Sequence, residues 1–167
     1  MHTVAAVYTS MNIISSIRDL FAELLPEVRL INIADSSLIE DVIAAGGVTP
    51  LVVRRLVAYW QAAAQTGADL ILNTCSSVGE VVELGQQFVD TPIVQIDHAM
   101  AEAAVRYAGA DETLSIGVLA TLLTTLGPTV RLVQRKAAEA GRAVTVHEGL
   151  AAGAYQQLVG GDAAEHD

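Results

Sequence analysis

Short apolar runs alternate with longer segments of helical periodicity along almost the whole chain, and this alternation limits the possible folds more than any other feature. Runs of four to six apolar and β-branched residues predict strands over residues 4–8, 28–33, 70–74, 93–96, 114–119 and 143–147. Between these runs, apolar residues three or four positions apart predict helices. Strands that alternate with helices form parallel sheets through right-handed crossovers, so we predict an α/β fold.

Capping and breaking residues set the ends of the expected helices. Pro26 closes the first helix, and Thr49 with Pro50 opens the third. Gly127 and Pro128 are expected to open the last helix in the same way. The expected helices cover residues 13–25, 38–45, 51–65, 78–88, 98–108 and 127–140.

A restart of the pattern near residue 110 divides the chain into two parts. Four strand–helix units precede this point and two follow it. We therefore predict two flavodoxin-like parallel-sheet halves related by pseudo-symmetry, over residues 1–109 and 110–167. The second half is expected to be incomplete, because a two-stranded parallel sheet leaves both of its edges unpaired. We expect its remaining strands to be missing from this sequence rather than supplied by another chain.

Charge and cysteine content narrow the class of partner. The chain carries 19 Asp and Glu against 9 Lys and Arg, and the resulting net charge of −10 opposes binding to nucleic acid or to an anionic membrane. Its one cysteine, Cys75, excludes an internal disulfide or a cysteine-rich zinc site and suits the reducing cytoplasm. No apolar run is long enough for a membrane span, and the first residues lack the basic start of a signal peptide. We expect a cytoplasmic protein with a small-molecule partner.

Polar side chains follow the carboxyl ends of the predicted strands, where open parallel sheets bind their ligands. They are Thr9, Ser10 and Asn12 after the first strand, Asp35 and Ser36 after the second, Asn73, Thr74, Cys75, Ser76 and Ser77 after the third, Asp97 and His98 after the fourth, and Thr121 after the fifth.

Cys75 stands out among these residues because it is expected where a strand meets a helix, and a helix N-terminus favours the thiolate. The alternative is that Cys75 is only a small buried apolar residue. Asp97 and His98 are expected at the mouth of a cleft and could orient a substrate there, although capping of the next helix by Asp97 explains the pair without any role in function. His147 and Glu148 are neighbours on a strand and cannot face one metal ion, so we expect no metal site there.

Three segments resemble the aspartate/glutamate/hydantoin racemase superfamily. Residues 67–77, GADLILNTCSS, look like the strand and turn that carry a catalytic cysteine of that family, and Cys75 falls on that cysteine. Residues 91–99, TPIVQIDHA, resemble the next strand and turn, and residues 116–121, IGVLAT, resemble the strand that opens the second half. The order of the three segments is that of the family, and the resemblance covers essentially the whole chain.

The resemblance implies two α/β halves with the active site between them, one cysteine from each half and neither a metal nor an organic cofactor. Inversion of a carbon centre needs a base on one face of Cα and an acid on the other. By the resemblance, Cys75 is one such group, and Thr9, Ser10, Ser76, Ser77 and Thr121 line the site for a small carboxylate substrate. The resemblance also implies a homodimer, to which the apolar helix around Trp60 is expected to contribute.

Two departures from the family leave the reaction open. Ser76 and Ser77 stand where the family usually has Asn-Thr, so the substrate need not be aspartate or glutamate. The family's second cysteine has no counterpart in this sequence. The alternatives to an amino-acid or hydantoin racemase are a lyase of the arylmalonate decarboxylase type, an isomerase of the maleate type with a nucleophilic cysteine, and a non-catalytic protein that binds small carboxylates.

Overall fold

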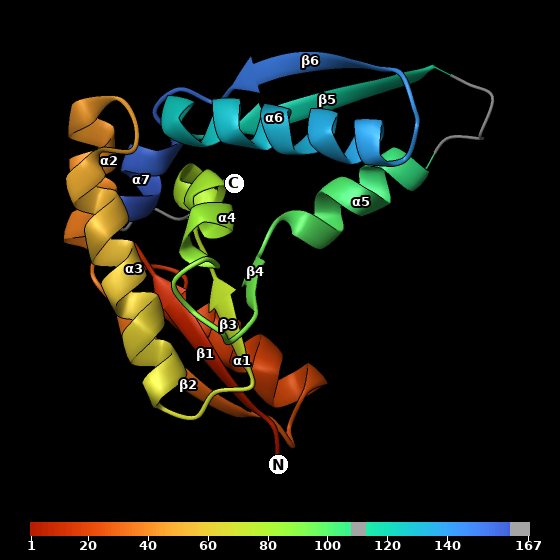
Figure 1. Ribbon diagram of the computed structural model, residues 1–167. Coiled ribbons are helices and arrows are strands. Elements are labelled where there is room, and N and C mark those ends of the chain that lie inside the picture. Colours follow the sequence, from red (N-terminus) through yellow and green to blue (C-terminus); the bar gives the residue numbers. More distant parts are fainter. Residues whose placement is uncertain (108–112, 161–167) are drawn as a thin grey trace. The chain divides into compact units, whose positions relative to one another are not determined.

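Contacts within the chain form two compact units, Met1–Ile96 and Asp97–Asp167. The computed structural model describes residues 1–107 and 113–160 (Figure 1). The boundary expected after residue 109 lies outside these residues. Residues 161–167, at the end of the predicted second half, lie outside them too. Each unit is therefore described on its own.

The first unit is built on a parallel sheet of four strands. They are β1 (Thr3–Tyr8), β2 (Arg29–Ala34), β3 (Leu70–Asn73) and β4 (Ile93–Gln95), in the order β2-β1-β3-β4. This order is that of the first four strands of a flavodoxin-like sheet, as the alternating pattern predicted. In the register, Val7 of β1 pairs with Asn73 of β3, and Asn73 pairs with Gln95 of β4.

The helices of the first unit begin and end largely where the capping residues predict. They are α1 (Ile14–Leu24), α2 (Ser37–Ala45), α3 (Pro50–Gln65), the 3₁₀ helix η1 (Ser76–Val81) and α4 (Val82–Gly85). Thr49 Oγ1 accepts a hydrogen bond from the Val52 amide at 3.3 Å, and Pro50 occupies the first position of α3. Gly46 ends α2 with φ at 68°, a left-handed conformation that favours glycine.

The expected long helix over residues 78–88 is wrong. The chain instead forms η1 and then the short helix α4. Tertiary contacts explain the difference. The Gln95 side chain donates a hydrogen bond to the Gly79 carbonyl, and Gly85 lies directly against the Trp60 ring. Periodicity along one segment cannot reveal contacts with β4 and α3.

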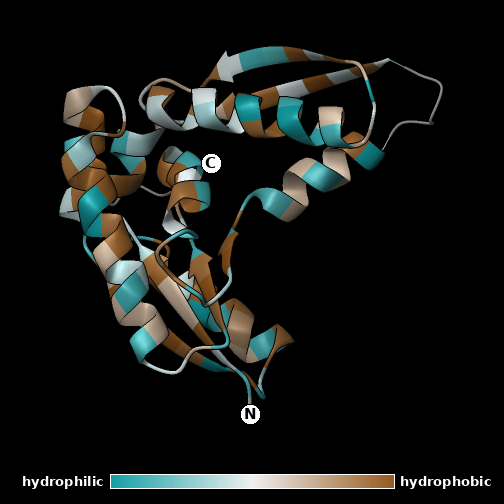
Figure 2. Cartoon of the chain, viewed as in Figure 1, coloured by the Kyte–Doolittle hydropathy of each residue, from teal (hydrophilic) through white to brown (hydrophobic). Residues whose placement is uncertain are grey.

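Apolar residues of the sheet separate onto its two faces, as alternation along a strand requires. Ala5 and Val7 belong to the larger core cluster, which includes Trp60, whereas Ala6 and Tyr8 pack with α1 on the other face. Polar and apolar residues alternate along α3 in Figure 2. Trp60 is fully buried within this unit, so the apolar side of α3 covers the sheet, where we expected part of a homodimer interface.

The second unit contains two parallel strands, β5 (Leu114–Ala120) and β6 (Val144–Leu150), together with α5 (His98–Arg106), α6 (Leu123–Glu139) and α7 (Ala154–Gly160). The sequence pattern did not predict α7. Strand β6 also runs beyond the expected residue 147, because residues 147–150 stay in register with residues 117–120.

The expected start of α6 at residue 127 is wrong, because the helix begins at Leu123 and contains Pro128. Leu126, Val130 and Val133 lie at helical spacing and join one buried cluster, and this burial extends the helix toward its N-terminus. Pro128 is the sixth residue of α6, where its missing N–H removes one early hydrogen bond. None of the helices described here is long and apolar enough to cross a membrane.

Candidate active site

Cys75 lies between the end of β3 and the first residue of η1, as the sequence predicted. Its backbone is extended, with φ −125° and ψ 115°, and its side chain is partly exposed. The Cys75 side chain also packs against the larger core cluster of the first unit, which includes Trp60. Because η1 is a six-residue 3₁₀ helix, fewer peptide dipoles are aligned toward Cys75 than the expected α-helix would provide.

Two residues that precede Cys75 fix the position of its backbone. The amide and the hydroxyl of Thr74 both donate to the Val7 carbonyl, at 3.2 and 3.0 Å. Asn73 Nδ2 donates to the Cys75 carbonyl at 3.0 Å. These bonds tie the Cys75 turn to the end of β1 and to the last residue of β3.

Asn73 was expected to bind substrate, and its side chain is only 1% exposed. Its Oδ1 atom is buried, and none of the described residues donates a hydrogen bond to it. A buried acceptor without a donor costs about 1–3 kcal/mol. The structure thus places Asn73 beneath the Cys75 turn, with its amide group directed to the backbone of Cys75.

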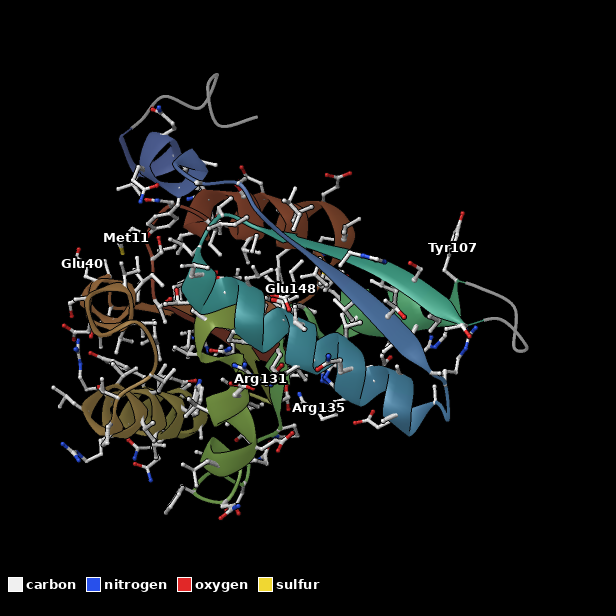
Figure 3. The ribbon with its side chains drawn as sticks, turned by 90° about the horizontal axis from the view of Figure 1, so that it is seen from above. Met11, Glu40, Tyr107, Arg131, Arg135 and Glu148 are labelled. Carbon is white, nitrogen blue, oxygen red and sulfur yellow. The ribbon has the colours of Figure 1, made fainter. Side chains whose placement is uncertain are left out.

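The polar turn after β1 begins next to the Cys75 turn. Val7 pairs with Asn73, so Thr9 and Cys75 each come two residues after a paired position on neighbouring strands. Thr9 is buried and Ser10 is partly exposed. The exposed Asn12 donates its amide to Ser10 Oγ at 3.4 Å. Met11 of the same turn, labelled in Figure 3, is 56% exposed.

The two serines that follow Cys75 differ in burial. Ser76 is partly exposed, whereas Ser77 is buried. Their hydroxyls therefore differ in access to a bound molecule. Among the candidate residues of the first unit at this edge of the sheet, Ser10, Asp35, Cys75 and Ser76 are partly exposed, and Asn12 and Ser36 are exposed.

Three expected site residues belong to the second unit. Asp97 occupies the capping position of α5, but its side chain forms no capping hydrogen bond, so the expected helix cap is not made. Asp97 is buried, and its Oδ1 has no hydrogen-bond donor among the described residues. His98 Nε2 lies 3.2 Å from Glu102 Oε1, and Thr121 is partly exposed just after β5.

A polar cluster at the end of β2 was not predicted as a unit. Asp35 accepts hydrogen bonds from the Ser37 amide at 3.1 Å, the Ser37 hydroxyl at 2.7 Å and the Tyr59 hydroxyl at 2.6 Å. Arg55 also pairs with Asp35, and its Nη1 lies 2.7 Å from Asp41 Oδ2. Arg55 thus joins α3 to α2 and to the end of β2. The sequence signal that could have indicated this cluster is the four-residue spacing of Arg55 and Tyr59, which places them on one side of α3.

The cluster predicts a dependence of stability on pH. Burial of the Asp35 carboxyl raises its pKa, but the hydrogen bonds and the charge supplied by Tyr59, Ser37 and Arg55 outweigh burial and lower this pKa from 3.8 to about 2. A carboxyl whose pKa is lower in the folded state than in the unfolded state stabilises the fold above about pH 4. This stabilisation is lost as the pH falls toward 2. Urea unfolding is therefore expected to show that wild type loses about 2 kcal/mol more than Asp35→Asn between pH 5 and pH 2. Equal losses in the two proteins would show that the carboxylate contributes nothing.

No three His, Cys, Asp or Glu side chains within residues 1–107 and 113–160 are grouped so that they could hold a metal ion.

Two solved glutamate racemases have similar folds. The enzyme from Aquifex pyrophilus is 15% identical with a TM-score of 0.65, and the match covers 87% of this chain and 54% of that enzyme. The enzyme from Francisella tularensis subsp. tularensis SCHU S4, solved in complex with D-glutamate, is 12% identical with a TM-score of 0.70, and the match covers 96% of this chain and 57% of that enzyme. This chain thus spans somewhat more than half the length of either enzyme.

A search of the curated proteins found no match to this sequence. The sequence profile of the family described as Asp/Glu/Hydantoin racemase, in contrast, matches residues 4–166. This match takes in nearly all of the chain, including both units and the Cys75 turn, and the fold agrees with that of the two racemases. The chain therefore belongs to the Asp/Glu/hydantoin racemase family.

Proposed function

We propose that this protein is a cofactor-independent racemase or isomerase that acts on an amino acid, a hydantoin or a related carbon acid. The observation that carries the proposal is the place of Cys75. It is the one thiol of the sequence, it is partly exposed, and it follows the third strand of a racemase-family fold. Hydrogen bonds made by the Thr74 and Asn73 side chains fix the position of its backbone.

The proposed chemistry is a proton transfer at carbon. The Cys75 thiolate removes the proton from the carbon next to a carboxylate or carbonyl, so that a C–H bond breaks and an S–H bond forms. The electron pair moves onto the adjoining oxygens, where hydrogen-bond donors stabilise it. Ser10, in the turn after β1, and Ser76, next to Cys75 in the chain, supply partly exposed hydroxyls for this purpose. Return of a proton to the opposite face inverts the centre.

A second candidate follows from the cysteine count. Inversion needs an acid on the face opposite Cys75, and these 167 residues contain no second thiol to provide it. Protonation from one face alone suits a lyase of the decarboxylase type, in which loss of CO₂ creates the carbanion and Cys75 donates the proton. The two candidates differ in whether a C–H or a C–C bond breaks.

We also propose a homodimer in the cytoplasm as the working form. The family resemblance supports the dimer, and the acidic chain with a single thiol supports the location. Sedimentation of the purified chain at several concentrations tests whether it forms a dimer. Microscopy of a tagged chain in cells tests whether it lies in the cytoplasm.

The decisive experiment is incorporation of deuterium from D₂O at the α-carbon of a panel of amino acids, hydantoins and aryl malonates. Mass spectrometry detects the exchange, and chiral chromatography detects the configuration of the product. Exchange with inversion is expected for at least one amino acid or hydantoin. Release of CO₂ from an aryl malonate without exchange of amino acids would support the lyase instead. A chain that exchanges nothing and releases nothing, while it binds carboxylates, would overturn both candidates.

A further inference from the structure

Two buried amide side chains lie side by side beneath the Cys75 turn. Asn73 and Gln95 are paired positions on β3 and β4, so their side chains leave the sheet on the same face. They are 1% and 7% exposed. The preceding residues of these strands on that face are Ile71 and Ile93, which belong to the apolar core. The row of apolar side chains thus ends in two amides.

Both amides donate to carbonyls of the segment that carries the thiol. Asn73 Nδ2 donates to the Cys75 carbonyl at 3.0 Å, and Gln95 Nε2 donates to the Gly79 carbonyl. The contact of η1 with the same Cys75 carbonyl, from the Val78 amide, is longer at 3.3 Å. The turn is therefore held from the sheet at both ends.

Glycine at position 79 leaves room for the Gln95 amide. A Cβ atom at Gly79 would lie 3.2 Å from Gln95 Oε1, which is tighter than an ordinary contact. With a larger residue there, the Gln95 side chain would have to shift by a few tenths of an ångström.

The arrangement is not the one that stability alone favours. The Asn73 Oδ1 atom is buried, and the described residues offer it no donor. An apolar side chain of the same shape would remove this unpaired acceptor. The amide contributes, in return, a fixed position for the Cys75 backbone.

We propose that Asn73 and Gln95 are positioning residues that hold the Cys75 turn so that the thiol faces the reacting carbon. The proposal rests on the proposed function of Cys75 as an acid–base group. Neither amide touches the substrate in this scheme, and both act through the backbone of residues 75–79.

The test uses near-isosteric variants of the full chain, Asn73→Leu and Gln95→Met. Since the sequence has one cysteine, the rate of alkylation by iodoacetamide reports on Cys75 alone and needs no substrate. A released turn exposes the partly buried thiol, so alkylation at neutral pH is expected to become at least about fivefold faster in each variant. The kcat of the exchange reaction is expected to fall with KM unchanged, because the substrate contacts remain.

Gln86→Met is the matched control. Gln86 is another amide of the first unit that bonds backbone groups, with Nε2 2.6 Å from the Val89 carbonyl and Oε1 2.8 Å from the Ile93 amide. These bonds hold the loop before β4 rather than the Cys75 turn. Gln86→Met is expected to alkylate at the wild-type rate, even where it lowers the urea midpoint as much as the other two variants do.

Wild-type alkylation rates and an unchanged kcat in folded Asn73→Leu and Gln95→Met would overturn the proposal. Where Asn73→Leu does not fold, Asn73→Ala carries the same expectation without the added bulk. A wild-type chain that neither exchanges nor decarboxylates any substrate would overturn the function proposed for Cys75. In that case the alkylation rates would still decide whether the two amides hold the turn.

Discussion

Replacement of Cys75 with serine is expected to lower the rate of deuterium exchange at the substrate α-carbon by about a thousandfold or more. A serine hydroxyl is a far weaker acid than a thiol, so it neither accepts nor returns a proton at neutral pH at a useful rate. The substitution keeps the size and the partial exposure of the side chain. Its effect on the free energy of unfolding is therefore expected to be about 1 kcal/mol or less.

Ser16→Ala serves as the control for Cys75→Ser. Ser16 is an exposed residue of α1 and is not among the candidate site residues. Exchange by this variant is expected to equal that of the wild type. If Cys75→Ser retained exchange within a factor of about ten, another group would be the acid–base residue.

The sequence was sufficient to predict the sheet of the first unit. Each strand is a short apolar run with a turn residue at its end, and the parallel direction of the strands follows from the intervening helices. Thr49 and Pro50 marked the start of α3 because capping depends on residues next to one another in the chain. Local signals were reliable where local hydrogen bonds decide the structure.

The errors arise where distant residues decide the structure. The helix expected over residues 78–88 is shortened by Gln95 and by Trp60, which lie on other elements. The start of α6 was placed at Gly127, before Pro128, on a local rule, whereas burial of Leu126 extends the helix to Leu123. Tertiary packing overrode local preference in both segments.

The position of the candidate site could be predicted from the sequence, but the burial and contacts of its individual residues could not. The strand-end motif located Cys75, because the end of a buried strand can be read from the chain. The burial of Asn73 depends on its pairing with Val7 and Gln95, which no single segment shows. The Asp35 cluster likewise depends on α3 packing close to the end of β2.

The contact between Gly85 and Trp60 leads to the second prediction of large effect. A Cβ atom at position 85 would lie 2.2 Å from Cζ3 and 2.4 Å from Cε3 of the Trp60 ring, so the ring or α4 must move. Trp60 is fully buried among the core residues of the first unit and has no room to move. Gly85→Ala is therefore expected to lower the free energy of unfolding by about 3 kcal/mol.

Urea unfolding followed by far-ultraviolet circular dichroism measures this loss in every variant, including those in which Trp60, the one tryptophan of the chain, is replaced. Gly47→Ala is the matched control, since a Cβ atom there meets nothing within 4 Å, and its stability is expected to lie close to that of the wild type. Trp60→Leu should make room for the new methyl group, so the two substitutions together should cost less than the sum of their separate costs. Strict additivity, or a stable Gly85→Ala protein, would show that α4 shifts freely. Because α4 continues directly from the turn that carries Cys75, such freedom would also argue against a fixed position for the thiol.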